Sequence, residues 1–134
     1  MGLDTSHGCW RGSYSLFSAF RNAIARAAGY RTEMVVYGGG LKSETPMIDW
    51  GHLPEGHPEG IWPELPDDPL LVLIAHSDCD GVIKSEHCDP IADRILEVMP
   101  YIEDKDGIGL VKRALEFVDG LRTASALGED VTFG

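Results

Sequence analysis

The segment with the strongest chemical character runs from His76 to Cys88 and reads HSDCDGVIKSEHC. Carboxylates stand at alternate positions, Asp78 and Asp80, and Gly81 follows where the chain must turn back. Oxygen donors at every second position before a glycine are typical of a short loop that wraps a hard cation. The segment therefore predicts a site for a divalent metal ion.

The same segment also contains imidazole and thiol groups, which bear on the choice of metal. Calcium prefers about six to eight oxygen ligands, whereas imidazole and thiolate favour zinc or another transition metal. Calcium and zinc therefore both stand as candidates for the cofactor. The candidate metal ligands are His76, Asp78, Cys79, Asp80, Glu86, His87 and Cys88, with His7 from the N-terminal region.

The elements that would position these ligands follow from the hydrophobic pattern. Residues 70–75, LLVLIA, form a continuous apolar run, which predicts a central strand buried on both faces. A strand at residues 2–6, parallel to the first, would bring His7 and Cys9 to the same sheet edge as His76. We expect an α/β fold in which a short, mostly parallel sheet is covered by about three helices.

Apolar residues at helical spacing predict the helices. In residues 14–28 the apolar stripe contains Phe17 and Ile24, and Arg21 and Asn22 are placed elsewhere on the helical wheel. Ser13 is the expected cap of this helix. The other expected elements are a helix from Asp89 until Pro100 ends it, a helix over about 108–127, a short edge strand at 130–133, and an irregular Pro/Gly-rich excursion at about 31–69 that holds at most a short strand at 33–37.

Size and composition limit the class of protein. A chain of 134 residues with 43% hydrophobic residues is expected to form a single domain, 1–134, with its own core. The formal charge of −11 argues against nucleic-acid binding and favours cations or a basic protein surface as partners. The apolar run is too short for a membrane span, and three cysteines fit a reducing cytoplasm. The oligomeric state stays open.

The loop and the whole chain each carry a resemblance. Residues 76–87 resemble the calcium loop of the EF-hand family, with Asp78 and Asp80 at the third and fifth positions, Gly81 at the sixth and a carbonyl at Val82. They depart from it at both ends, where histidines replace the acidic ligands. The chain is also similar to small phage, prophage and actinobacterial proteins, through GLDTSH at 2–7, HSDCDG at 76–81, IADR at 91–94 and FVDGLR at 117–122. This second resemblance implies a phage or bacterial setting and carries no mechanism.

Three functions are consistent with these patterns. The leading one is a small, phage-encoded protein that binds a divalent metal. A metal-dependent hydrolase of a small phosphorylated or acyl substrate is an alternative, with Asp80 or Glu86 as base and Trp50 and Trp62 in a pocket wall. A third is an acidic protein that occupies a basic surface of a host protein. Against the first two, Asp and Gly are common in tight turns, so the HSDCDG motif also fits a turn without a ligand.

Overall fold

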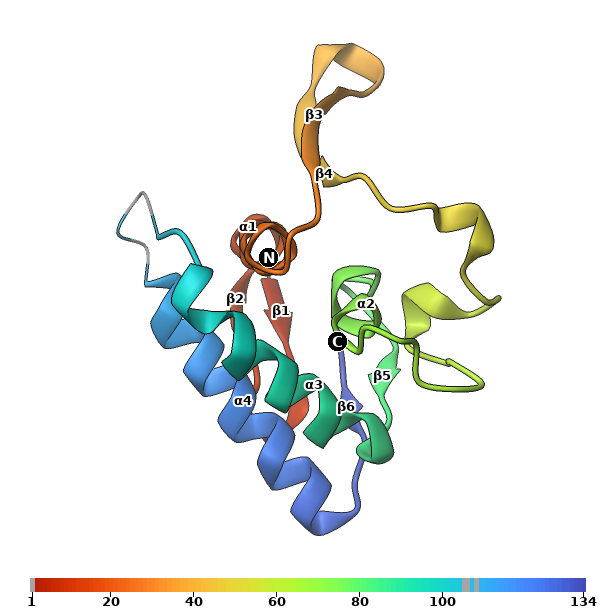
Figure 1. Cartoon of the computed structure of the whole chain (residues 1–134), viewed down its shortest axis with the longest axis vertical. Coiled ribbons are helices and arrows are strands. Elements are labelled where there is room, and N and C mark those ends of the chain that lie inside the picture. Colours follow the sequence, from red (N-terminus) through yellow and green to blue (C-terminus); the bar gives the residue numbers. More distant parts are fainter. Residues whose placement is uncertain (1, 105–106, 108) are drawn as a thin grey trace.

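Helices dominate the described part of the chain, which comprises residues 2–104, 107 and 109–134 of a computed structural model. Within it the long helices are α1 (Tyr14–Ala27), α3 (Ser85–Val98) and α4 (Leu110–Leu127), and α2 (Leu70–Ile74) is short. The strands form two-stranded antiparallel sheets (Figure 1). These pair β1 (Gly2–Asp4) with β2 (Arg11–Ser13), β3 (Thr32–Val36) with β4 (Lys42–Pro46), and β5 (Val82–Ile83) with β6 (Val131–Thr132).

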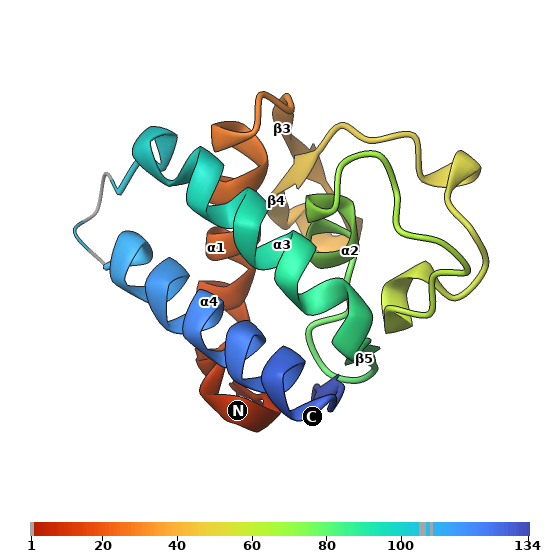
Figure 2. The same cartoon turned by 60° about the horizontal axis from the view of Figure 1, so that its bottom comes forward.

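The core lies between the three long helices. Figure 2 shows α3 and α4 side by side, with α1 crossing behind them. Ile91 and Ile95 of α3, Phe117 of α4 and Phe17 and Phe20 of α1 are fully buried there, and burial of such side chains is the main source of stability in a domain of this size. No helix of the described residues combines the length and the apolar character that crossing a membrane requires.

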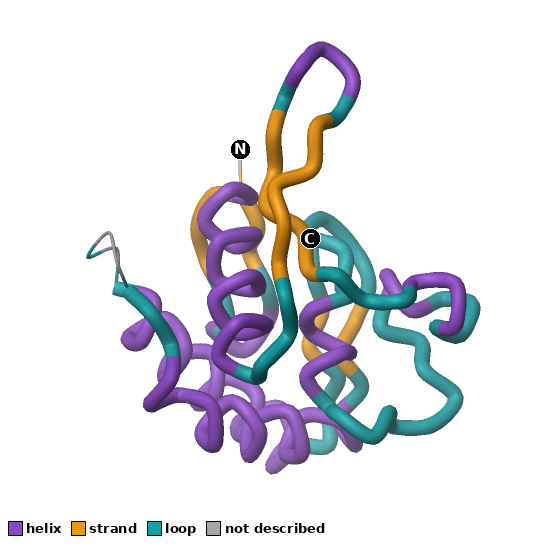
Figure 3. Tube along the Cα trace, turned by 45° about the horizontal axis from the view of Figure 1, so that its top comes forward, coloured by secondary structure: helices purple, strands orange, loops and turns teal. Residues whose placement is uncertain are grey.

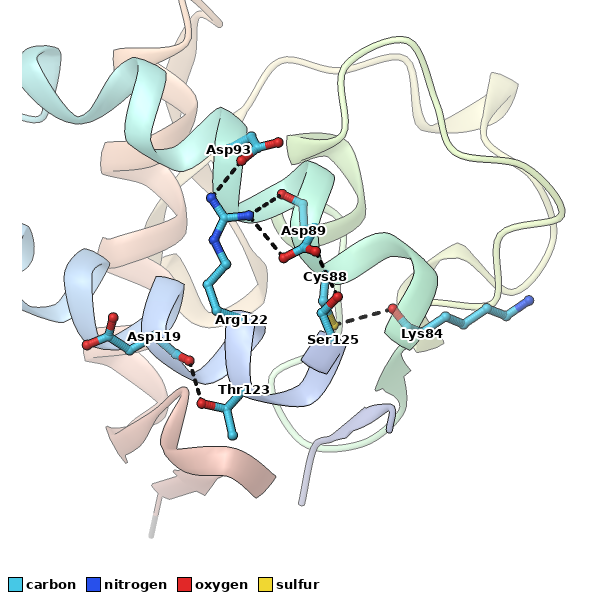
Figure 4. Close-up of polar contacts among 8 residues, drawn as sticks. All are labelled: Lys84, Cys88, Asp89, Asp93, Asp119, Arg122, Thr123 and Ser125. Carbon is cyan, nitrogen blue, oxygen red and sulfur yellow. Dashed lines mark hydrogen bonds and ion pairs between the residues drawn. The ribbon is translucent and has the colours of Figure 1, made fainter. Parts of the chain in front are cut away.

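A polar network joins α3 and α4 on their outer side (Figure 4). The Arg122 guanidinium donates to Asp89 at 3.0 Å and to Asp93 at 2.6 Å, and the Ser125 hydroxyl donates to Asp89 at 2.9 Å. These hydrogen bonds, first from Arg122 and then from Ser125, lower the pKa of Asp89. Because the network is exposed, it contributes little to the free energy of unfolding. Its main effect is on how α3 and α4 are aligned.

The prediction of the first helix is confirmed, including its cap. The Ser13 hydroxyl accepts a hydrogen bond from the Leu16 amide at 3.1 Å, and the chain leaves the helix through Gly29 at a φ of 93°. The placement of Asn22 on a polar side of the helix is wrong, since its side chain is only 6% exposed. It is covered by β4, where its amide donates to the Glu44 carbonyl at 3.1 Å.

The predicted central strand at residues 70–75 is wrong, because this run forms the helix α2. A continuous apolar run buried on all sides has no periodicity that separates a strand from a helix. The preceding Asp68 and Pro69 favour the helix: the Asp68 carboxylate accepts from the Leu70 amide at 3.0 Å, as an N-cap does, and Pro69 has helical backbone angles.

The mostly parallel sheet is wrong for the same reason, since it required the strand at 70–75. Residues Gly2–Asp4 do form a strand, β1, but it pairs antiparallel with β2, and Gly2 lies opposite Ser13. The short C-terminal strand is confirmed as β6, antiparallel to β5, and an isolated bridge joins Thr5 to Phe133. The fold therefore combines helices with small antiparallel sheets.

The two C-terminal helices differ from prediction at their first residues. α3 begins at Ser85, four residues before the predicted Asp89, so that Pro90 lies inside the helix. Its N-terminus is capped from far along the chain, since the Asp130 carboxylate accepts from the Ser85 amide at 2.8 Å. α4 ends at Gly128 as expected, and Ile108 lies outside the described residues.

The excursion at 31–69 contains more regular structure than predicted. β3 and β4 form a hairpin, residues 32–46, which we call the arm. The arm projects from the helical body (Figures 1 and 3). Short 3₁₀ turns follow at Trp50–His52 and His57–Glu59 before the chain reaches α2.

Candidate functional site

The HSDCDG loop is folded around the imidazole of His76, which is 1% exposed. Its Nδ1 lies 2.8 Å from the Ser77 carbonyl oxygen and its Nε2 lies 2.7 Å from that of Val82. Phe133, just after β6, stacks on the ring with centroids 3.9 Å apart. The first residue of the predicted metal loop therefore lies between two backbone carbonyls of the loop itself.

The protonation of His76 is set by two opposed effects. Burial lowers its pKa first, and Arg21 acts in the same direction, while the two carbonyls and Asp80 oppose them. Burial prevails, so the neutral ring is favoured, and a neutral imidazole donates from only one nitrogen. Its other nitrogen then faces a carbonyl oxygen with no proton between them, so only one of the two contacts is a hydrogen bond.

The remaining predicted ligands are spread over several surroundings. Cys79 and Asp80 are exposed and Asp78 is half-buried in the loop, whereas Glu86 is exposed on α3. His87 is 5% exposed, and its Nδ1 has no hydrogen-bond partner among the described residues. Burial is the first cause that lowers the pKa of His87.

Two of the three cysteines are buried as thiols. Burial, with a contribution from Cys88, raises the pKa of Cys9 to about 12, and burial likewise raises the pKa of Cys88 to about 12. Thiols with raised pKa values are poor metal ligands, since the thiolate is the ligand form. All three cysteines, including the exposed Cys79, are free.

His7 takes part in a separate contact. Its ring nitrogens lie 2.7 Å from the Ser6 hydroxyl and 3.0 Å from the Glu129 carboxylate. The N-terminal region does approach the loop, through the bridge from Thr5 to Phe133, which covers His76. The expected juxtaposition of the two histidines is thus replaced by a link through Phe133.

The arrangement does not fit a preformed metal centre at His76. The Val82 carbonyl, which would be a ligand in an EF-hand loop, lies 2.7 Å from Nε2 of His76 instead. In the part of the chain that the structure describes, no three His, Cys, Asp or Glu side chains lie close enough together to hold a metal ion. Metal binding by this loop stays a prediction.

A cavity of about 210 Å³ lies beside the loop, between α1, β4 and the end of α2. Its lining is mostly polar, and Trp50 provides an aromatic wall. A neighbouring hollow of about 420 Å³ shares several of these residues and reaches Asp78 and Lys42. We call the two together the cleft. The smaller cavity is lined by Ser18, Arg21, Asn22, Ser43, Glu44, Thr45, Pro46, Trp50, Ile74 and Ala75.

Arg21 is the cation of the smaller cavity. One of its terminal amino groups donates to the His76 carbonyl, and the guanidinium lies 4.8 Å above the centre of the Phe17 ring. Its Nε is buried and has no hydrogen-bond partner within residues 2–104, 107 and 109–134. Burial lowers its pKa, but an arginine starts so high that it stays charged.

The acidic groups beside Arg21 are partly engaged elsewhere. The Glu44 carboxylate forms an ion pair with Arg26 and accepts from the Thr32 hydroxyl at 2.6 Å. Asp78 is close enough to Arg21 to favour its charged form. The cleft therefore presents a guanidinium and several hydroxyl groups beside the carboxylates of Glu44 and Asp78, in a chain whose overall charge is strongly negative.

Sequence reasoning missed Arg21, although a signal for it was present. Arg21 lies four residues after Phe17 and three before Ile24, which places it on the buried stripe and not elsewhere on the wheel. A charged residue on an apolar stripe needs a partner or a function. Trp50, expected in a pocket wall, does line the cleft, whereas Trp62 is 3% exposed in the core.

Comparison with known proteins adds no relative: no family model, no curated protein and no solved structure matches this chain.

Proposed function

We propose that this protein binds a small organic anion, a carboxylate or a phosphate monoester, in the cleft with Arg21 as its charged contact. The observation that carries the proposal is the half-buried Arg21 at a cavity, with its buried Nε unpartnered among the described residues. Guanidinium groups bind carboxylate and phosphate through paired, charge-assisted hydrogen bonds.

The surroundings of Arg21 support a small ligand with one planar or apolar part. Hydroxyl groups of Ser18, Ser43 and Thr45 line the cavity and can donate to anionic oxygens. Trp50 lies at its wall and stacks on His57 with centroids 6.1 Å apart, so its orientation is supported from behind. A pocket with an aromatic wall and a few polar groups is the usual design of a small-molecule site.

Fluorescence titration tests the proposal. Trp50 is 37% exposed at the cleft while Trp10 and Trp62 are 2% and 3% exposed, so a ligand in the cleft acts mainly on Trp50. The probes are phenyl phosphate and benzoate, and benzyl alcohol is the neutral control. We expect a saturable change with the anions that weakens about tenfold or more in Arg21→Gln, the loss typical of a charged hydrogen bond.

Arg113 offers a matched control. It too lies over an aromatic ring, 4.9 Å from the centre of Trp10, and donates to a backbone carbonyl, that of Arg11, at 2.6 Å, but it does not line the smaller cavity. Arg113→Gln should bind the probes as the wild type does. Ser18→Leu, which fills the cavity and keeps Arg21, should weaken binding, and this variant tests the site if Arg21→Gln is unstable. Equal affinity for benzyl alcohol, or no binding of either anion, would refute the proposal.

Metal binding, metal-dependent hydrolysis and occupation of a basic host surface stay predictions from the sequence. Titration of the protein with zinc or calcium, compared with Asp80→Asn, tests metal binding. The same samples, assayed on a panel of phosphate and acyl esters, test metal-dependent hydrolysis. Capture from host lysate at two salt concentrations tests the third.

A further inference from the structure

The two edges of the arm are protected to different degrees. On the outer edge of β4, Pro46 has no amide hydrogen, and the Glu44 carbonyl accepts from the Asn22 side chain at 3.1 Å. Lys42 adds a charge to the same edge. Proline, lysine and covering side chains are the usual means by which an edge strand avoids pairing with another chain.

The hydrogen bonds of the hairpin show which backbone groups of β3 point outward. The Met47 amide donates to the Arg31 carbonyl at 2.7 Å, and the Tyr37 amide donates to the Leu41 carbonyl at 2.7 Å. Bonded and non-bonded pairs alternate along an antiparallel ladder. Residues 33 and 35 therefore bond to β4, whereas the amide and carbonyl groups of Thr32, Met34 and Val36 point away from it.

The outer edge of β3 has none of the protection found on β4. It contains neither proline nor lysine, and the outward backbone groups of 32, 34 and 36 have no partner in the described part of the chain. The side chains of Met34 and Val36 are 62% and 60% exposed. The arm is anchored to α1 through β4, but its sheet has only two strands, so a further strand beside β3 would add backbone hydrogen bonds to it.

We propose that β3 pairs antiparallel with β3 of a second copy of this chain, about a two-fold axis at Met34. In this register Met34 faces Met34 of the second copy, and Thr32 of each copy faces Val36 of the other. Every outward amide and carbonyl of β3 therefore meets an outward group of the second copy. Three such pairs exchange two hydrogen bonds each. The two hairpins then form one four-stranded antiparallel sheet with an isologous interface.

The distribution of charge favours association of two copies through the arm rather than through the helical bodies. The chain carries a formal charge of −11, so two helical bodies repel each other. The arm with its flanking Arg31 is neutral, because Arg31 and Lys42 balance Glu33 and Glu44. Since the arm projects from the body (Figure 1), pairing through β3 joins the neutral parts and keeps the acidic bodies apart. Salt should therefore strengthen the association, because it screens the repulsion of the bodies.

Sedimentation velocity over about 10 to 500 µM, the range suited to a small interface, tests the proposal. We expect a concentration-dependent dimer that Met34→Pro abolishes, since proline removes an outward amide that the hairpin itself does not use. Lys42→Pro is the matched control: it removes an outward amide of β4, and the extended Leu41 before it accepts a following proline. That variant should dimerise as the wild type does.

Disulfide formation tests the register independently of stability. In a Cys79→Ser background, which removes the exposed thiol, Met34→Cys should form a disulfide-linked dimer on mild oxidation, because the two residues at the axis lie within bridging distance. Val36→Cys is equally exposed but lies opposite Thr32 of the second copy, so its two thiols are too far apart to bridge.

Clear results would overturn the proposal. These are a monomer throughout the concentration range, equal dimerisation of Met34→Pro and the wild type, or equal crosslinking at positions 34 and 36. A dimer that weakens as NaCl rises from about 0.05 to 0.5 M would also contradict it, because an interface between neutral arms has no ionic attraction to screen.

Discussion

The HSDCDG loop and the cleft lie next to each other and use polar groups in opposite ways. In the loop, both ring nitrogens of His76 face carbonyls of the same loop, so the most conspicuous chemical groups of the sequence serve the fold. In the cleft, Arg21 retains an unpartnered Nε among the described residues although nothing around it forms a motif. A dense motif can therefore mark internal hydrogen bonding, and a single charge on an apolar stripe can mark a site.

The largest effect should come from the cover of the loop. Phe133→Ala removes a ring that is 7% exposed, stacks on His76 and meets Phe17 edge-to-face, and a buried Phe→Ala change costs about 3 to 5 kcal/mol. Thr132→Ala, the exposed neighbour, should change the free energy of unfolding by less than about 0.5 kcal/mol. Urea denaturation measures both. A similar loss in the two variants would contradict the role assigned to Phe133.

The next largest effect should come from lower pH, which acts on the buried histidines His76 of the loop and His87 of α3. Burial lowers the pKa of His76 and His87 in the folded state, so the unfolded state binds protons more readily and stability rises with pH. As the pH falls below the unfolded value of about 6.5, the melting temperature should drop by several degrees. The melting temperature of His87→Gln, which lacks one of the two histidines, should drop by less over the same pH range. A melting temperature that rises between pH 7 and pH 5 would show the opposite sign.

A smaller effect is expected at the wall of the cleft. Glu44→Gln removes the charge that pairs with Arg26 and accepts from Thr32, at a cost of about 1 kcal/mol, since the pair is partly exposed. Glu33→Gln, whose partner Arg31 is exposed, should cost close to nothing. Thermal melts compare the two; an equal effect would mean that the Glu44 pair does not fix β4 against α1.

The smallest effect should follow metal removal. Because the His76 ring and the Val82 carbonyl face each other in place of a metal ion, a chelator should leave the melting temperature unchanged within about 1 °C. Differential scanning fluorimetry with EDTA, then with zinc or calcium, measures this. A rise of several degrees on adding either metal would instead support the metal-binding prediction and show that the loop rearranges to bind it.

Local patterns predicted the helices well and the sheet poorly, for a physical reason. Caps and stops such as Ser13, Gly29 and Gly128 act through neighbouring residues, so the sequence shows them directly. Residues 70–75 are apolar on every side, which removes the periodicity that distinguishes strand from helix, and the error spread to the whole predicted topology.

Long-range contacts account for what the sequence did not show of the site. The N-terminus of α3 is capped by Asp130, and Arg21 reaches the carbonyl of His76 from another helix. Neither pairing has a local signature. The clustering of donors in the HSDCDG loop was visible, but whether they bind a ligand or one another depends on the path of the backbone.

The bridge between Thr5 and Phe133 has a consequence for biosynthesis. During translation the N-terminal strands and α1 leave the ribosome well before the residues that cover His76 and cap α3. The loop therefore stays uncovered on the nascent chain until residue 133 has been made, and its closure depends on contacts between distant residues. Such contacts slow folding, so a nascent chain that stalls before residue 133 should be open to proteases around the loop.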